Sequence, residues 1–145
     1  MTKQWTVQQA LNQIEQGNSV CAAIREGMII ATETGRGVAP ILNLYHQGSL
    51  TGSFLVDKVV GKAAAMVMTR GRIAGCHAIT VSRAALNWFQ KQGVPITYDH
   101  LADYIVNRTG DGMCPMEQTV LELEEDGNIV SVLEETLAKF RNQTK

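Results

Sequence analysis

The chain of 145 residues lacks most of the features that mark a specialised class of protein. It has three cysteines, three prolines and a net charge of −1. It has no apolar run long enough to cross a bilayer, and its amino terminus has no apolar signal core. Few, widely spaced cysteines argue against a disulfide scaffold, and the balanced charge argues against broad nucleic-acid binding, which needs a basic face. We therefore expect a cytoplasmic protein that binds neither membrane nor nucleic acid.

What the chain does have is an apolar fraction of 45%, which is enough for a sizeable hydrophobic core. Its length falls within the usual range of one domain. No internal repeat, low-complexity tract or linker rich in proline and serine divides it. We expect residues 1–145 to form a single domain.

The amino-terminal part predicts a helix followed by an antiparallel hairpin. Thr6 and Gln9 have the spacing of a capping box, which predicts that a helix begins there and stops at Gly17. Apolar segments over 20–24 and 28–32 are separated only by a turn at Glu26-Gly27. So short a connection requires antiparallel pairing of the two strands.

Farther along the chain, predicted strands alternate with predicted helices. We expect strands over 53–59, 73–81 and 95–98, and helices over 35–45, 61–69 and 82–92, with two more beginning near 114 and 128. This alternation favours right-handed crossovers and a sheet covered by helices on both faces. The sequence therefore predicts a three-layer α/β fold with a mixed, mostly parallel sheet.

One candidate site lies where the third strand passes into a helix, at Asp57, Lys58, Gly61 and Lys62. Ligands bind outside the carboxyl ends of parallel strands, and a helix start with two nearby ammonium groups suits a phosphate or carboxylate. Lys62 would be a Schiff-base nucleophile if it were buried, and Asp57 would move protons. Alternatively, Gly61 serves close helix–sheet packing, and the lysines are solvated with Asp57 pairing one of them.

A second candidate site lies around the start of the later helix. A thiolate at Cys114 would be stabilised by the helix dipole, and Glu117, one turn on, would act as a base or a cap. Gly110 and Gly112 would let backbone N–H groups approach an anion. The alternative is a small buried cysteine ahead of a helix that begins with proline.

The loop before this helix carries Asn107 and Arg108. These side chains either hold the loop by hydrogen bonds or, for Arg108, grip a carboxylate or phosphate. Cys76 and His77 lie on an apolar strand and are predicted to be structural. The histidines and cysteines have no metal-ligand spacing, so we expect neither a metal nor a cofactor.

Two motifs, over 56–65 and 107–117, resemble those of an uncharacterised prokaryotic domain of unknown function within the cytidine deaminase-like superfamily. The likeness extends from about Val20 to about Val120, and the order of predicted elements also matches that fold. Zinc deaminases carry His or Cys followed by Glu at one helix start and Pro-Cys-x-x-Cys at the next. Here these positions fall in 35–38 and 57–62, which hold no zinc ligand motif. We expect no ordinary cytidine deaminase activity.

Together these patterns predict a small-molecule binding protein or enzyme whose pocket joins the two candidate sites. The expected ligand is anionic, a nucleotide or a phosphorylated metabolite. Two alternatives remain open: a non-catalytic ligand sensor, and a structural or protein-interaction module in which the motifs shape an oligomer interface, such as that of a homodimer.

Overall fold

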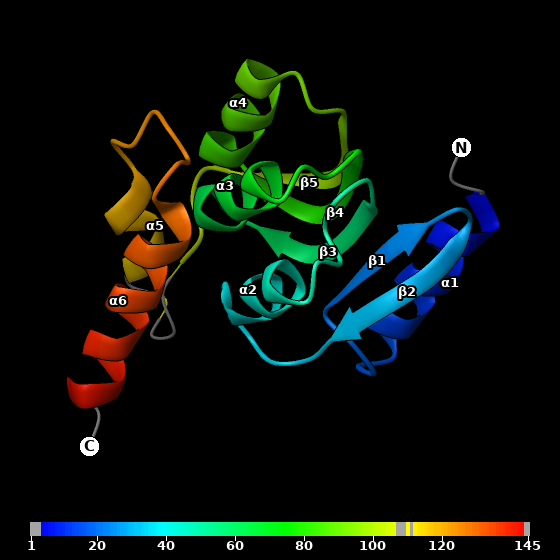
Figure 1. Ribbon diagram of the computed structural model, residues 1–145, viewed down its shortest axis with the longest axis horizontal. Helices are drawn as coiled ribbons and strands as arrows, with labels where there is room; N and C mark the ends of the chain where they lie inside the picture. The colour runs from blue at the N-terminus through cyan, green and yellow to red at the C-terminus, as the bar shows by residue number, and fades with distance from the viewer. Residues whose placement is uncertain (1–3, 107–109, 111, 144–145) are drawn as a thin grey trace.

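A computed structural model of the chain describes residues 4–106, 110 and 112–143. Within these residues the backbone forms a five-stranded sheet and six helices (Figure 1). The strands are β1 (Cys21–Arg25), β2 (Met28–Glu33), β3 (Phe54–Val60), β4 (Gly75–Ser82) and β5 (Ile96–Ala102). The helices are α1 (Gln4–Glu15), α2 (Ala39–His46), α3 (Lys62–Arg70), α4 (Arg83–Gln92), α5 (Pro115–Val120) and α6 (Ile129–Gln143).

The strand order is β2-β1-β3-β4-β5. The predicted hairpin is confirmed: β1 and β2 pair antiparallel across a turn in which Glu26 and Gly27 have φ of 54° and 76°. Two positive φ angles are typical of the type I′ turn that matches strand twist. The predicted parallel run β3-β4-β5 is also confirmed. However, β1 is antiparallel to β3 as well, so the sheet is evenly mixed rather than mostly parallel.

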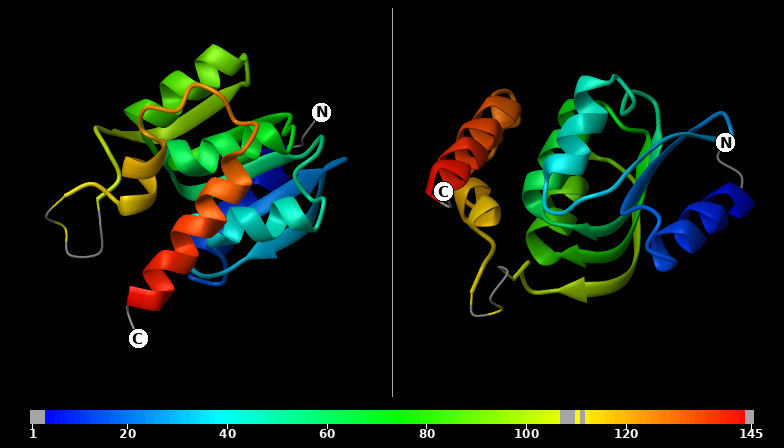
Figure 2. Two further views of the ribbon diagram at one scale, coloured as in Figure 1. Left: turned by 60° about the vertical axis from the view of Figure 1, so that its left-hand side comes forward. Right: turned by 90° about the horizontal axis from the view of Figure 1, so that it is seen from below.

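Helices cover both faces of the sheet unequally, as Figure 2 shows. Helices α2, α3 and α4 lie on one face, and α1 packs on the other against β1, β2 and β3. Helices α5 and α6 pack on the outside of α3, away from the sheet. The fold is therefore α/β as predicted. Helices α5 and α6 add a fourth layer to the three layers that the sequence predicts.

The position of α3 between two layers explains its composition. All residues from Ala63 to Met68 are buried, since the sheet covers one side of the helix and α5 and α6 cover the other. A helix buried all round is apolar all round, and its alanines allow close approach to the strands. The core thus extends from the sheet through α3 to Met116, Val120 and Leu133 in the outer layer.

Two predicted helix starts are wrong, and each has a local cause. The helix predicted from residue 35 begins at Ala39, because Gly35 and Gly37 have φ of 108° and 67° and so cannot be helical. The first helix begins at Gln4, before Thr6. The Thr6 hydroxyl is buried and donates instead to the backbone carbonyl of Gly27, 2.8 Å away. No helix among residues 4–106 and 112–143 is long and apolar enough to cross a membrane.

Candidate functional site

The two candidate sites meet at the amino terminus of α3. The Glu117 carboxylate, on α5, accepts hydrogen bonds from the backbone N–H groups of Lys62 (2.6 Å) and Ala63 (3.1 Å). Burial raises the pKa of the Glu117 carboxyl, and the N–H groups of Ala63 and Lys62 and the Lys62 charge oppose this rise. Glu117 therefore supplies the anion that the helix start was predicted to take from a ligand.

Gly61 is required at this junction by space rather than by backbone conformation. Its φ of −96° and ψ of 176° are open to any residue. A Cβ built on Gly61 would collide with the carboxyl carbon and both oxygens of Glu117. The glycine thus lets a carboxylate from another helix reach the first N–H groups of α3.

The Lys62 side chain turns from this junction toward the segment that follows α5. Its ammonium donates to the backbone carbonyls of Leu121 (3.0 Å) and Leu123 (2.6 Å). These carbonyls hold the charge in place beside α4, where it lies 5.8 Å from the centre of the Trp88 ring. Burial lowers the pKa of Lys62, the Lys91 charge lowers it further, and nearby glutamates, led by Glu122, oppose both effects. Lys62 is therefore half-buried and hydrogen-bonded rather than freely solvated, whereas Lys58 is exposed.

Asp57 is buried in the middle of the sheet, with 5% of its surface exposed. It pairs in register with Cys21 across β1 and β3. Burial raises the pKa of Cys21 and of Cys76, and the Asp57 charge raises both further. Burial raises the pKa of Asp57 to about 8, although the N–H groups of Lys58 and Val59 lower it in part. A carboxyl group with this pKa is mostly protonated at neutral pH and can both give and take a proton.

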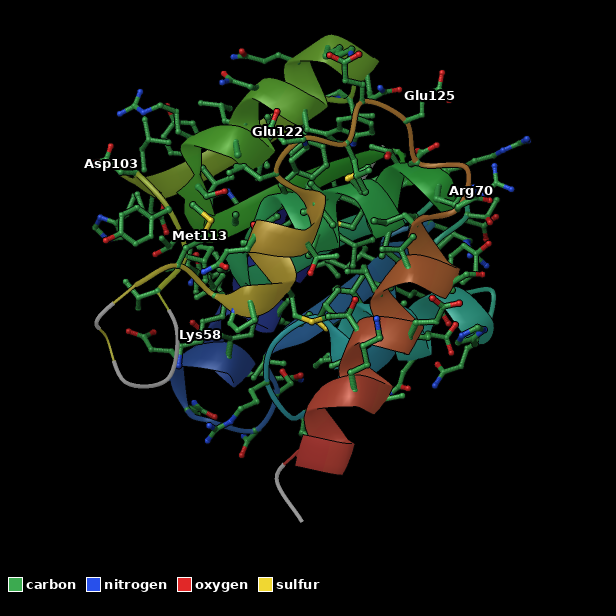
Figure 3. The ribbon with its side chains drawn as sticks, turned by 90° about the vertical axis from the view of Figure 1, so that its left-hand side faces the viewer. Lys58, Arg70, Asp103, Met113, Glu122 and Glu125 are labelled. Carbon is green, nitrogen blue, oxygen red and sulfur yellow. The ribbon has the colours of Figure 1, made fainter. Side chains whose placement is uncertain are left out.

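The remaining predicted residues are placed less centrally. Lys58 is exposed near the end of β3 and, in Figure 3, lies below Met113 and farther from Glu122. Cys114 is half-buried against the core, and its N–H donates to the carbonyl of Ile105. Gly110 has φ of 74° and open space around it, and Gly112 is half-buried. Asn107 and Arg108 lie outside the described residues.

An open pocket of about 310 Å³ lies between α4 and the segment joining α5 to α6. We call it the Lys62 pocket, since Lys62 is the one predicted site residue on its wall. Its charged and polar wall residues are Lys62, Asn87, Lys91, Glu122 and Glu124, and the Trp88 indole is also part of the wall. The ammonium groups of Lys62 and Lys91 each lie 5.8 Å from the Trp88 ring centre, within the range of a cation–π contact. The ring nitrogen of Trp88 donates to Thr69, which fixes the indole.

Sequence reasoning did not connect α4 or the Glu122–Glu124 segment with Lys62. Trp88 and Lys91 lie on a strongly amphipathic helix, where a buried tryptophan and an exposed lysine are ordinary. The available signal was the spacing Trp88-x-x-Lys91, which places both side chains on neighbouring positions of one helix face. That signal becomes specific only when the fold brings Lys62 beside it.

Cys76 occupies the core position predicted for it, whereas only one ring nitrogen of His77 is satisfied, because its buried Nε2 has no hydrogen-bond partner among the described residues. Cys76 is buried in the main core. On the other face, His77 Nδ1 lies 2.7 Å from the Thr97 hydroxyl, and Nε2 lies 3.6 Å from an Asp99 oxygen. Among the described residues, no group of three or more His, Cys, Asp or Glu side chains is arranged to hold a metal ion.

Comparison with known proteins places the chain in a family. Residues 9–137 match the family model described as TM1506, domain of unknown function (DUF1893). The crystal structure of a DUF1893 family protein (TM1506) from Thermotoga maritima, at 2.70 Å resolution, is similar, with a TM-score of 0.83 and 27% sequence identity. The match covers 94% of this chain and 92% of that chain. No curated protein matches. Because the family model spans most of its length, the chain belongs to the DUF1893 family.

Proposed function

We propose that this protein binds a small anionic molecule in the Lys62 pocket. The observation that carries this proposal is the pair of ammonium groups on Lys62 and Lys91, which face one open pocket beside a fixed indole. Among the described residues, neither ammonium has a carboxylate oxygen within 4.0 Å. Two positive charges without a carboxylate within 4.0 Å favour an anion between them, and the partly buried Lys62 gains most from one.

The amino terminus of α3 is a weaker candidate for the same anion. Glu117 already accepts both N–H groups there, and Gly61 leaves no further room around its carboxylate. A phosphate at this place would have to displace the buried Glu117 carboxylate, which already accepts two backbone hydrogen bonds. The anion is therefore expected on the α4 side of Lys62, where the pocket is open.

We also propose that the fold is the cytidine deaminase-like one, without its zinc chemistry. The order of a helix, an antiparallel hairpin and three strand–helix alternations supports this placement. The start of α3, where zinc deaminases carry their cysteine pair, holds Gly61 and Lys62 and is capped by Glu117. With these replacements we expect no zinc-dependent deamination.

A second candidate function is proton-transfer catalysis at Asp57. It is favoured by one observation, the buried carboxyl whose pKa is raised to about 8 beside two cysteines. Asp57 does not line the Lys62 pocket, so catalysis there would need a different opening to the sheet. The two candidates are separated by testing Asp57→Asn, which should leave binding at the Lys62 pocket intact.

The experiment is a thermal-shift screen with inorganic phosphate, adenosine 5′-monophosphate and succinate as probes. A probe at one hundred times its dissociation constant adds about 2.7 kcal/mol, which raises the melting temperature of a chain this size by roughly 5–10 °C. Lys91→Gln should remove most of the shift, because Lys91 is exposed and its loss leaves the fold intact. The matched control is Lys139→Gln, an exposed lysine on α6 away from the pocket. No shift with any of these three probes would count against a simple anion in the Lys62 pocket.

A further inference from the structure

The Lys62 pocket presents charges of both signs in comparable number. Lys62 and Lys91 contribute two ammonium groups, and Glu122 and Glu124 contribute two carboxylates. A site specialised for a phosphate dianion is normally dominated by positive charge and N–H donors. This pocket instead has two positive and two negative side chains, so its lining does not select for negative charge alone.

The four charges do not neutralise one another by direct contact. Among the residues that the structure describes, none of these four side chains is in an ion pair within 4.0 Å. Two of the Lys62 protons are directed at the carbonyls of Leu121 and Leu123, so its position is set by the backbone and not by a glutamate. The glutamates still act on Lys62 through space, since Glu122 and Glu124 both oppose the lowering of its pKa. The charges are thus near one another but separated.

The charged side chains come from three elements, and the Lys62 ammonium, from the start of α3, is held against the carbonyls of the segment that carries the glutamates. Lys91 lies on α4, and Glu122 and Glu124 lie on the segment that joins α5 to α6. In Figure 3 the labelled Glu122 and Glu125 lie at different points along this segment, Glu122 nearer α5 and Glu125 nearer α6. Glu125 is not on the wall of the Lys62 pocket. A molecule seated in the pocket therefore meets ammonium groups and carboxylates together, with Lys91 on the α4 side and Lys62 beside the glutamates.

We infer that the ligand is a zwitterion, a small molecule that carries an ammonium group as well as a carboxylate or phosphate. This inference rests on the proposed function and names the class of ligand for the same pocket. The anionic group binds between Lys62 and Lys91, and the ammonium binds Glu122 and Glu124. A simple anion gains the same lysine contacts but is repelled by the two carboxylates, so discrimination comes from both attraction and repulsion. The volume of about 310 Å³ suits a metabolite of amino-acid size.

The test uses three probes that share a four-carbon chain: 4-aminobutyrate, butyrate and butylamine. Binding is measured by thermal shift and calorimetry on the full chain at pH 7. We expect 4-aminobutyrate to bind at least tenfold more tightly than either single-charge probe. In the double variant Glu122→Gln and Glu124→Gln, this preference over butyrate should disappear. Both glutamates are exposed, so the variant keeps the fold. Glu125→Gln, in the same segment but outside the pocket, should keep the preference.

Each result decides the inference separately from the proposed function. Equal binding of 4-aminobutyrate and butyrate, or a preference that survives the double variant, would overturn the zwitterion and leave anion binding in place. Binding of phosphate or succinate without binding of 4-aminobutyrate, butyrate or butylamine would likewise overturn the zwitterion and leave anion binding in place. If no probe of either set binds, the proposed function fails together with the inference.

Discussion

Oε1 of Glu117 lies 2.6 Å from the backbone nitrogen of Lys62, although the two residues are 55 positions apart in the chain. This contact joins the two motifs that the sequence singles out. Gly61 makes room for the carboxylate, and the carboxylate caps the buried helix α3. The contact therefore fastens α5 to the start of α3.

Gly61→Ala should destabilise the protein by about 1–3 kcal/mol, the usual range for overpacking a filled site. The backbone conformation of Gly61 suits alanine, so the whole cost comes from the collision with Glu117. Urea denaturation measures it. The control is Gly127→Ala, where a Cβ meets nothing within 4 Å and φ is not left-handed. That variant should be neutral or slightly stabilised.

Glu117→Ala should cost about 1–3 kcal/mol, because it leaves two N–H groups of α3 without their charged acceptor. In the double variant with Gly61→Ala, the alanine at 61 no longer collides with a carboxylate. The two costs should therefore fall short of adding, by at least 0.5 kcal/mol. Strict additivity would show that Gly61 and Glu117 do not act on each other.

Asp57 makes stability depend on pH. Its ordinary pKa is 3.8 and its pKa in the fold is about 8, so the folded protein holds a proton that the unfolded chain releases. Stability is full below about pH 4 and falls as pH rises toward 8, by up to about 1.4 kcal/mol per pH unit. Asp57→Asn should remove this slope, which is read from the difference between the unfolding curves of the two proteins. A constant difference from pH 5 to pH 8 would contradict the raised pKa.

Lys62→Met should reduce stability by about 1 kcal/mol or more, since its ammonium holds the carbonyls of Leu121 and Leu123. From the sequence alone, little loss is expected at this position, because exposed lysines contribute little to folding. Lys91→Gln should cost within about 0.5 kcal/mol, because Lys91 is exposed. Thermal melts of the two variants side by side test the contrast. Equal costs would mean that the carbonyl contacts of Lys62 do not support the fold.

Much of the fold follows from local pattern. The hairpin turn, the parallel strands from β3 onward and the helix expected over 82–92 are indicated by patterns of residues close in sequence, and they appear as predicted. The start of α2 and the role of Thr6 depend on contacts with other segments or on left-handed glycines, and there the predictions fail. The sequence pattern of a segment thus predicts whether it forms a helix or a strand, and its contacts with other segments set the exact residues at which it begins and ends.

The candidate site shows the same division. Gly61, Lys62 and Glu117 are recognisable as special residues, and the segments that carry them are in contact. A pocket that joins all the candidate residues stays a prediction. What each residue contacts could not be read from the chain. The indole of Trp88 and the ammonium of Lys91 reach Lys62 only because α3 and α4 pack side by side. A pocket made by three separate elements leaves no contiguous motif.

The measurement that tests the proposed binding most directly is the fluorescence of Trp88. The chain has one other tryptophan, Trp5, which Trp5→Phe removes. A ligand that enters between Lys62 and Lys91 changes the charges beside the indole, so 4-aminobutyrate, phosphate or succinate should produce a saturable change in emission. In the double variant Trp5→Phe and Lys91→Gln, the same titration should give a dissociation constant at least tenfold higher. Binding in the Lys62 pocket would be contradicted if none of these probes altered the Trp88 emission. It would also be contradicted if the Lys91 variant gave the same dissociation constant.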